Sequence, residues 1–420
     1  MNAASRKVQR TYLTLLLLST LAASFIWGVN TLFLLDAGLS NTEAFAANAF
    51  FTLGSVLFEV PTGVVADTQG RRMSYLLGTL TLAGSTLLYL LLWQLEVSFW
   101  AWALTSVLLG LGFTFFSGAV EAWLVDALTH TGFFEAKGKL ESVLAKGEIV
   151  EGVGMLGGSV LGGALAQMTS LGVPYMLRIG ILCVTFVVAF VSMHDIGFEP
   201  SRSKNVFKEV RRVLRASIDQ GLGNPPVRWL MLAGPFSGAV MVYAFYAMQP
   251  YLLELWGDEK AYGVAGLAAA IVAGAQIAGG LLVPYAGRVF GRRTTVVMLG
   301  TFASAAVLAV IGFVQNFWIV LGCLVLWALL FATVTPVRQA YLNGLIASNQ
   351  RATVLSFDNM LGSTGGVVAQ PALGKVADVW GYPPSYLICA AIQACGLPFL
   401  WIARRLRAKS DSMAESEGGG

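Results

Sequence analysis

Gly63-Val-Val-Ala-Asp67-Thr-Gln-Gly70-Arg71-Arg72 is the stretch that decides how this chain folds, because it lies between two long apolar segments. The chain has only a few residues there in which to reverse direction, and they include a carboxylate, two glycines and a pair of arginines. Charged groups at the edge of a bilayer are costly unless they pair with each other or with a helix end. The stretch therefore predicts a short polar hairpin whose charges hold two membrane helices in place.

The composition excludes an ordinary soluble protein. Hydrophobic residues make up 56% of the 420 residues and charged residues only 12%, whereas a soluble domain carries about 25% charged residues. The net charge of +4 is spread over short loops, so it does not indicate a nucleic acid partner. The four cysteines and two histidines lack metal-ligand spacing, and transition-metal sites need several nitrogen or sulfur ligands. We expect a membrane protein with no metal and no cofactor.

Twelve apolar runs are long enough to cross a bilayer, which takes roughly 20 helical residues. Only helices and closed barrels satisfy the backbone in lipid, and these runs are far longer than barrel strands of about 10 residues. The first run also exceeds the apolar region of a signal peptide, about 7–15 residues, so we expect it to be retained. The sequence predicts an all-α membrane protein with spans near 11–35, 42–66, 73–95, 98–128, 140–168, 173–195, 226–256, 261–286, 294–313, 316–345, 352–378 and 384–404.

Charge in the loops predicts the orientation and the domain boundaries. Arginines and lysines gather on alternate connections, and the remaining connections carry mainly acids such as Asp36 and Glu43. The positive-inside rule then places both termini in the cytoplasm, with the protein in the plasma (inner) membrane. We expect an N-terminal six-helix bundle at 1–195, a linker with an amphipathic surface helix or a solvated tether at 196–225, a second bundle at 226–405, and a disordered tail at 406–420.

The two halves of the sequence echo each other. Val120-Glu121-Ala-Trp-Leu-Val-Asp126 aligns with Val337-Arg338-Gln-Ala-Tyr-Leu-Asn343, and Ser142-Val-Leu aligns with Thr353-Val-Leu. Gly70-Arg71-Arg72 aligns in turn with Gly291-Arg292-Arg293. The three matches keep the same order along the chain. They predict two pseudo-symmetric six-helix bundles, the parallel repeat found in one class of secondary transporters.

The opening stretch resembles the loop between the second and third helices of the major facilitator superfamily, and the topology and the repeat are similar as well. In that family the motif aspartate caps a helix of the other half and bonds the motif arginines, which closes a cytoplasmic gate. The resemblance implies this role for Asp67, with Arg71 or Arg72 as partners and the start of the eleventh helix as target. Gly63 and Gly70 are expected to allow close helix approach and a tight turn.

Charges inside the apolar spans are the next candidates, since such residues usually face a cavity or each other. Glu121 and Glu148 lie at similar depth on adjacent helices, Glu151 shares a face with Glu148, and Arg338 is the repeat equivalent of Glu121. Either Glu121 and Arg338 form a structural ion pair, or the three glutamates form a proton or substrate site. Asp126 is expected to bond Arg71 or Arg72 as part of the gate.

Glycines and aromatics complete the candidate residues. Gly154, Gly158 and Gly162 in the fifth span predict a helix-packing groove, and they are also similar to the family's antiporter signature. The family's cavity-lining helices carry further polar and aromatic candidates for contact with a substrate, namely Asn30, Trp123, Tyr243, Tyr246, Gln249 and Tyr341.

The resemblance implies a secondary transporter that works by alternating access, most similar to drug:proton antiporters of this superfamily. An acidic cavity with aromatic sides suits export of an amphipathic or cationic compound against protons. The alternative is an importer of a small polar or anionic solute, with Arg338 as ligand. A receptor or scaffold on the same fold stays open, whereas no catalytic motif indicates an enzyme. The expected partners are a small molecule, protons and the bilayer, with the chain acting as a monomer.

Overall fold

A computed structural model describes residues 3–95, 97–116, 118–198, 211, 215, 218–346 and 351–413. Within these residues the regular structure is helical, apart from one isolated bridge between Arg292 and Ser412. Eleven helical segments of the described residues are long and apolar enough to cross a membrane. The predicted span at 352–378 coincides with a further helix, Arg351–Trp380, which is not among those eleven. The predicted all-α membrane fold is thus confirmed.

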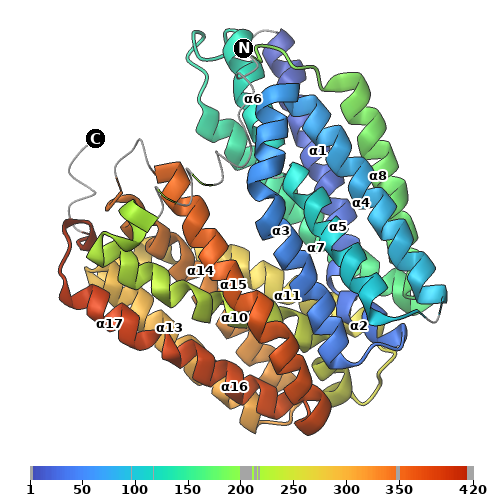
Figure 1. The fold of residues 1–420 in the computed structure, drawn as a ribbon, viewed down its shortest axis with the longest axis vertical. Helices are drawn as coiled ribbons and strands as arrows, with labels where there is room; N and C mark the ends of the chain where they lie inside the picture. The colour runs from blue at the N-terminus through green and yellow to red at the C-terminus, as the bar shows by residue number, and fades with distance from the viewer. Residues whose placement is uncertain are drawn as a thin grey trace. The chain divides into compact units, whose positions relative to one another are not determined.

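The chain divides into two compact units, and Figure 1 shows the helices of each. Unit 1 comprises Met1–Gly38, Phe50–Glu209 and Lys260–Ala270, and unit 2 comprises Leu39–Ala49, Val210–Glu259 and Ile271–Gly420. Two short segments therefore belong to the unit formed mainly by the other half of the sequence. The predicted boundaries at 195 and 226 miss this exchange, because tertiary packing rather than composition assigns these segments. The predicted amphipathic linker helix lies largely outside the described residues.

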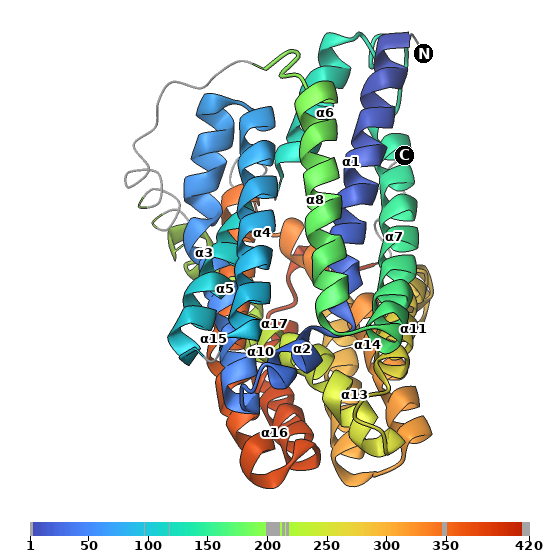
Figure 2. The same cartoon turned by 90° about the vertical axis from the view of Figure 1, so that its right-hand side faces the viewer.

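Unit 1 is a bundle of helices. They are α1 (Ala3–Trp27), α2 (Asn30–Asp36), most of α3 (Asn41–Gln69), α4 (Arg71–Gln94), α5 (Phe99–Phe116), α6 (Ala119–His130), α7 (Leu140–Met168) and α8 (Gly172–Ser192). Helix α1 packs against α7 and α8, and α4 packs against α5 and α8, so that α8 lies between α1 and α4 (Figure 2). Leu15, Tyr75 and Trp123 belong to the buried core of this unit.

Unit 2 has a comparable arrangement. Its elements are η1 (Ile218–Leu222), α10 (Pro225–Trp256), part of α11 (Tyr262–Gly280), α12 (Val283–Phe290), α13 (Arg293–Phe313), α14 (Phe317–Asn343), α15 (Arg351–Trp380), α16 (Tyr382–Cys395), α17 (Leu397–Arg405) and η2 (Lys409–Asp411). Helix α10 packs against α15, and α13 packs against α14 and α16. Val227, Val297 and Leu342 belong to the buried core of this unit.

Residues after α17 correct the expectation of a disordered tail. Asp411 is only 3% exposed, and the backbone N–H of Met413 donates to the carbonyl of Gly291 at 3.0 Å. Ser410 also donates its hydroxyl proton to the carbonyl of Tyr341 at 3.1 Å. The polar composition of 406–413 suggested disorder, but these side chains have partners in unit 2. Residues 414–420 lie outside the described part of the chain.

Candidate functional site

Arg71 occupies the centre of the charge cluster at the hairpin between α3 and α4. Its Nη1 lies 2.7 Å from Asp67 Oδ1, and its Nε lies 3.9 Å from Asp126 Oδ2. The guanidinium thus links the end of α3 to α6 inside unit 1. Both ion pairs are partly exposed, so each contributes little stability by itself. The three side chains are held together by several weak contacts and not by one strong contact.

The two glycines of the stretch differ in environment. Gly70 has φ +107°, and a Cβ there would collide with the carboxylate of Asp195, so the turn requires glycine. Gly63 has open space at the position of a Cβ. The expectation that Gly63 allows close helix approach is therefore not met in unit 1.

Asp195, which was not among the predicted residues, caps the start of α4. The backbone N–H of Arg72 donates to Asp195 Oδ1 at 2.9 Å. The Arg72 guanidinium donates to the carbonyl of Phe190 at 2.6 Å and lies 4.8 Å from the Phe190 ring centroid. A carboxylate at a helix N-terminus is favourable because it accepts from free N–H groups and opposes the helix dipole.

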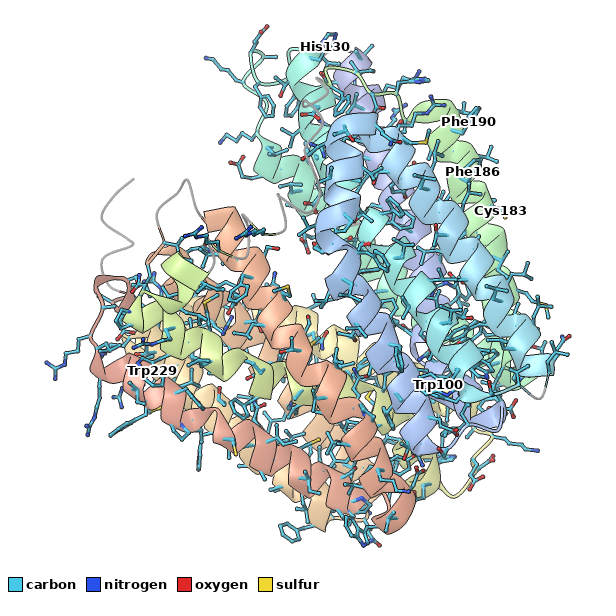
Figure 3. The ribbon with its side chains drawn as sticks, in the orientation of Figure 1. Trp100, His130, Cys183, Phe186, Phe190 and Trp229 are labelled. Atoms are coloured by element: carbon cyan, nitrogen blue, oxygen red, sulfur yellow. The ribbon has the colours of Figure 1, made fainter. Side chains whose placement is uncertain are left out.

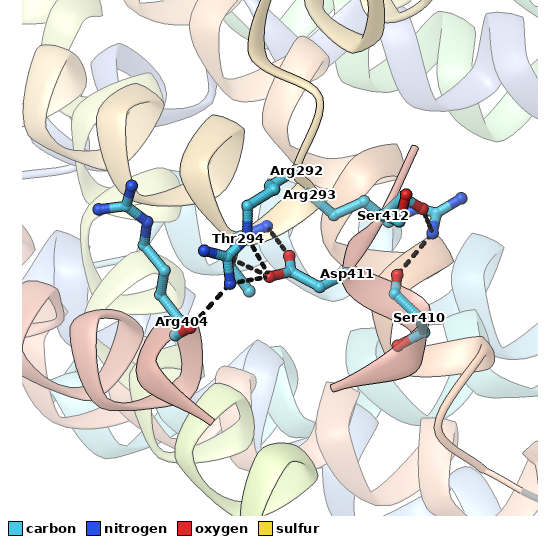
Figure 4. Close-up of polar contacts among 7 residues, drawn as sticks. All are labelled: Arg292, Arg293, Thr294, Arg404, Ser410, Asp411 and Ser412. Carbon is cyan, nitrogen blue, oxygen red and sulfur yellow. Dashed lines mark hydrogen bonds and ion pairs between the residues drawn. The ribbon is translucent and has the colours of Figure 1, made fainter. Parts of the chain in front are cut away.

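Unit 2 repeats this cap with Asp411, as Figure 4 shows. Asp411 Oδ1 accepts from the N–H of Thr294 at 2.8 Å, and Oδ2 accepts from the Thr294 hydroxyl at 2.9 Å. Arg292 donates to Oδ2 through Nε at 2.8 Å and Nη2 at 2.6 Å. Asp195 ends the sixth predicted span and Asp411 follows the twelfth, so the internal repeat extends to these caps.

Removal of the Asp411 carboxylate is expected to destabilise unit 2. Asp411→Ala leaves the Arg292 guanidinium and the Thr294 N–H without this acceptor, which costs about 1–3 kcal/mol. Thermal unfolding of the purified protein in detergent measures the change. A truncation after Met413 serves as the control and should unfold like the full chain, whereas a truncation after Ala408 should behave like Asp411→Ala. Equal stability of all four proteins would contradict this role for Asp411.

The predicted capping of the eleventh helix by Asp67 stays a prediction. Asp67 belongs to unit 1 and the start of α15 belongs to unit 2. Residues 347–350, immediately before α15, lie outside the described part of the chain.

Three glutamates come together in unit 1. Glu121 lies in the first turn of α6, and Glu148 and Glu151 lie on α7. Glu151 is close enough to the other two carboxylates to interact with them electrostatically, and all three carboxylates interact electrostatically with the hydroxyl of Tyr12. Tyr12 is only 3% exposed, and its hydroxyl lies close to Gly147 on α7. Within the described residues, no ion pair forms at any of the three carboxylates. Unit 1 therefore has three carboxylates within electrostatic reach of one another, one on α6 and two on α7.

Arg338 is already paired inside unit 2, which corrects its predicted role as a free ligand for an anion. Its Nη1 and Nη2 donate to Asp358 Oδ2 and Oδ1 at 2.6 and 2.7 Å, and Nη2 also donates to the carbonyl of Leu230 at 3.2 Å. The Asp358 side chain is 4% exposed and that of Arg338 is 21% exposed. The paired geometry of two parallel N–H···O bonds matches a guanidinium to a carboxylate. Arg338 thus has a carboxylate partner in its own unit and is not an unpaired anion ligand, whereas its pairing with Glu121 of unit 1 stays a prediction.

Asp358 was missed, although the sequence contains a signal for it. Arg338 lies five residues before the end of α14 at Asn343, and Asp358 lies seven residues after the start of α15 at Arg351, so the two are at similar depth. Comparing how far two residues lie from the connection between their helices also placed Glu121 and Glu148 at similar depth. The same comparison, made for oppositely charged residues in the second half of the sequence, identifies the Arg338–Asp358 pair.

The predicted packing glycines Gly154, Gly158 and Gly162 lie on the face of α7 that packs against α1. A Cβ on Gly158 would collide with Ser24, and one on Gly162 would collide with the backbone of Phe25. Ser24 donates its hydroxyl proton to the carbonyl of Gly154 at 3.0 Å. These glycines therefore let α7 approach α1 closely, the arrangement that small residues permit in membranes.

Several aromatic candidates lie inside the bundles instead of facing a cavity. Trp123 is 2% exposed and donates Nε1–H to the carbonyl of His194 at 2.6 Å. Tyr243 is fully buried and donates to Ser385 Oγ at 2.7 Å, and Tyr341 is fully buried in the unit 2 core. Their burial argues against direct contact with substrate. Pattern alone did not reveal this because core and cavity aromatics share the same helical spacing.

The other polar candidates have different environments. Asn30 begins α2, with two residues between it and the end of α1 at Trp27, and its Oδ1 accepts from the Tyr175 hydroxyl at 3.0 Å. Gln249 is 1% exposed and precedes Pro250 inside α10. Tyr246 is partly exposed on the same helix, which leaves it the aromatic candidate with the most accessible side chain among those on α10.

Asp378, near the end of α15, makes a second type of cap that was not predicted. Its Oδ1 accepts from the N–H of Asn41 at 2.8 Å, and its Oδ2 accepts from the N–H of Thr42 at 2.9 Å. The Thr42 hydroxyl donates to Oδ2 as well, and Tyr382 donates to Asn41 Oδ1 at 2.6 Å. Both Asn41 and Asp378 belong to unit 2. One carboxylate thus holds the first two N–H groups of α3.

Unit 1 contains an uncharged counterpart of this cap. The N–H of Gly263, near the start of α11, donates to Gln167 Oε1 at 3.2 Å. Gln167 and Asp378 end the related segments Gly163-Ala-Leu-Ala-Gln167 and Gly374-Lys-Val-Ala-Asp378. Both glycines fit tightly: a Cβ on Gly163 would lie 2.7 Å from Gly266 Cα, and one on Gly374 would lie 2.7 Å from the Asn41 carbonyl oxygen. Each unit therefore has one close glycine contact with a cap beside it.

Comparison with solved structures shows the fold. The chain is 11% identical to the nucleoside transporter NupG, with 97% of this chain and 100% of that chain covered and a TM-score of 0.77. It is 13% identical to a bacterial homolog of the human lysosomal transporter Spinster, over 98% and 99% of the two chains, with a TM-score of 0.74. The human organic anion transporter MFSD10 is 16% identical over 95% and 100%, with a TM-score of 0.63. At these identities the likeness concerns the fold alone.

Comparison of sequences shows the family. An uncharacterized MFS-type transporter of Methanocaldococcus jannaschii is 21% identical over 192 residues, which are 45% of this chain and 46% of that protein. The chain thus matches about half the length of this curated relative. The family model described as Major Facilitator Superfamily matches residues 12–282 and again 236–418, which together span nearly the whole chain. The chain belongs to the Major Facilitator Superfamily, a family of membrane transporters and not of enzymes.

Proposed function

We propose that this protein is a secondary transporter that exports an amphipathic or cationic compound in exchange for protons. The observation that carries the proposal is the group of three glutamates, Glu121, Glu148 and Glu151, without a basic partner among the described residues. A carboxylate in a membrane bundle is costly when charged and defaults to a role in proton or ion movement. A positively charged solute and a proton can then compete for the same acidic group.

The alternative, an importer of an anionic solute, receives less support. It relied on Arg338 as a ligand for the anion, and Asp358 already accepts hydrogen bonds from both Nη groups of the guanidinium. An anion at Arg338 would have to displace a carboxylate that is 4% exposed. The acidic residues of unit 1 would also repel an anion.

We infer that the two ends of the transporter open in alternation. Asp67, Arg71 and Asp126, which contact each other within unit 1, lie at the end that we assign to the cytoplasm together with both termini. The Asp378 cap, at the opposite ends of α3 and α15, lies at the end that we assign to the outer face. Alternating access in such repeats moves one bundle against the other around a central site.

Proteoliposomes with a pH-sensitive dye inside test the proposed exchange. Glu148→Gln and the triple change Glu121→Gln/Glu148→Gln/Glu151→Gln are expected to abolish proton flux that depends on an added cationic solute, because glutamine does not exchange a proton. Glu141→Gln removes an exposed acid in the first turn of the same helix and serves as the matched control, with normal flux. Flux that persists in the triple variant would rule out the glutamates as the proton site. Flux driven only by anionic solutes would instead favour the importer.

A further inference from the structure

A groove lies between the first turns of α1 and the last turns of α8 in unit 1. Its volume is about 480 Å³. Arg6, Lys7 and Arg10 line it from α1, and Val188 and Ser192 line it from α8. The two helices pack against each other, and Figure 2 shows them side by side near the N-terminus. The groove is therefore part of one unit and does not belong to the acidic site.

The groove concentrates positive charge without neutralising it. Its lining includes three cations and no acid. Within the described residues, Arg6, Lys7 and Arg10 form no ion pair, and all three are exposed. Thr14 and Ser192 add hydroxyl groups at the same place. Two guanidinium groups, one ammonium and two hydroxyls are a suitable set of donors for phosphate oxygens.

The outer surface of α8 beside the groove is apolar. Val187, Phe190 and Val191 are 58%, 55% and 64% exposed. Figure 3 shows Cys183, Phe186 and Phe190 along the outer side of this helix. In a protein that spans a bilayer, such a surface meets acyl chains. The basic groove thus lies at the end of an apolar strip on α8. A phospholipid has the matching arrangement, because its charged headgroup would lie in the groove and its acyl chains along the apolar strip.

We propose that this groove binds the phosphodiester headgroup of an anionic phospholipid in the leaflet that faces the N-terminus. The arginines and the lysine hold the phosphate oxygens, the hydroxyls of Thr14 and Ser192 donate to the remaining oxygens, and the acyl chains follow α8. Basic pockets between membrane helices hold lipid headgroups in this way. A zwitterionic lipid carries a cation of its own, so the three basic residues favour an anionic headgroup.

Native mass spectrometry of the full chain with defined lipids tests the site. Phosphatidylglycerol is expected to stay bound to the wild-type protein, while phosphatidylcholine is lost. Arg6→Gln/Lys7→Gln/Arg10→Gln should weaken phosphatidylglycerol binding about a hundredfold, which corresponds to about 1 kcal/mol for each cation. Lys137→Gln/Lys139→Gln/Lys146→Gln removes the same charge outside the groove and should bind like wild type. Arg6→Lys/Arg10→Lys keeps the charge and should retain most of the binding.

Two further outcomes would contradict the proposal, one concerning the source of the phosphate and the other concerning the site itself. Equal displacement of the lipid by inorganic phosphate or glycerol phosphate would show that the groove recognises a soluble phosphoester, and would overturn the lipid assignment. Equal loss of binding in the two triple variants would show a general charge effect without a site at α1 and α8. Because the variants are compared as purified, monodisperse proteins, failure to insert is recognised before the measurement. Transport activity does not enter this test, so its result is independent of the proposed proton exchange.

Discussion

Asp358→Ala is expected to prevent accumulation of folded protein, or to destabilise it by about 3–5 kcal/mol, because it leaves a charged guanidinium unpaired in the bundle. Arg338 links three helices of unit 2 through Asp358 on α15 and the carbonyl of Leu230 on α10. The carboxylate is nearly inaccessible, so water replaces it poorly. The yield of monodisperse protein and its resistance to chemical unfolding measure the effect.

A double variant separates the loss of a partner from the loss of the pair. Arg338→Met/Asp358→Leu removes both charges and should recover most of the stability that Asp358→Ala loses, since apolar residues of similar volume replace buried pairs well. Arg338→Met alone should also be unstable, because it leaves Asp358 buried. If Asp358→Ala unfolds like wild type, or if the double variant is no better than the single ones, the pair does not hold α14 and α15 together.

Asp378→Ala is expected to loosen the start of α3 with a smaller effect on global stability. The change frees the N–H groups of Asn41 and Thr42. Loss of a helix cap costs about 0.5–2 kcal/mol, so hydrogen exchange at these amides should accelerate about 2- to 30-fold. Mass spectrometry of a peptide that covers 39–49 measures the exchange.

The counterpart in unit 1 provides the control for this cap. Gln167→Ala should accelerate exchange near Gly263 and leave the peptide at 39–49 unchanged, because the two caps belong to different units. Its effect should be smaller, since an uncharged amide accepts a weaker hydrogen bond than a carboxylate. Unchanged exchange at 39–49 in Asp378→Ala would mean that the carboxylate does not restrain α3.

Much of the fold could be predicted because apolar length and loop charge act locally. The twelve runs, the repeat and the hairpin at 63–72 depend on residues that are close in the sequence. Arg71 lies near Asp67 and Asp126, a contact that short connections and helix depth make predictable. The glutamates at 121, 148 and 151 come together for the same reason.

Other features depended on partners far away in the sequence. Asp195 and Asp411 cap helices that begin more than a hundred residues earlier, as the contacts to Arg72 and Thr294 show. Nothing local distinguishes such an aspartate from a solvated one. The exchange of 39–49 and 260–270 between the units likewise follows from packing of glycines such as Gly163 and Gly374. Here the repeat did contain a usable signal, in the two related segments that end at Gln167 and Asp378.

The central claim is that the two ends of the molecule open in alternation under control of the three glutamates. Distances between paired spin labels in lipid nanodiscs, measured at about pH 5.5 and pH 8 on either side of physiological pH, test it most directly. One pair, at Gln94 and Val379, places one label in each unit and reports the Asp378 end, and the other, at Thr68 and Ala352, does the same at the Asp67 end. We predict that the two distances change in opposite directions with pH and that Glu121→Gln/Glu148→Gln/Glu151→Gln removes the change. Distances that stay fixed, that change in the same direction, or that respond equally in the triple variant would contradict the account.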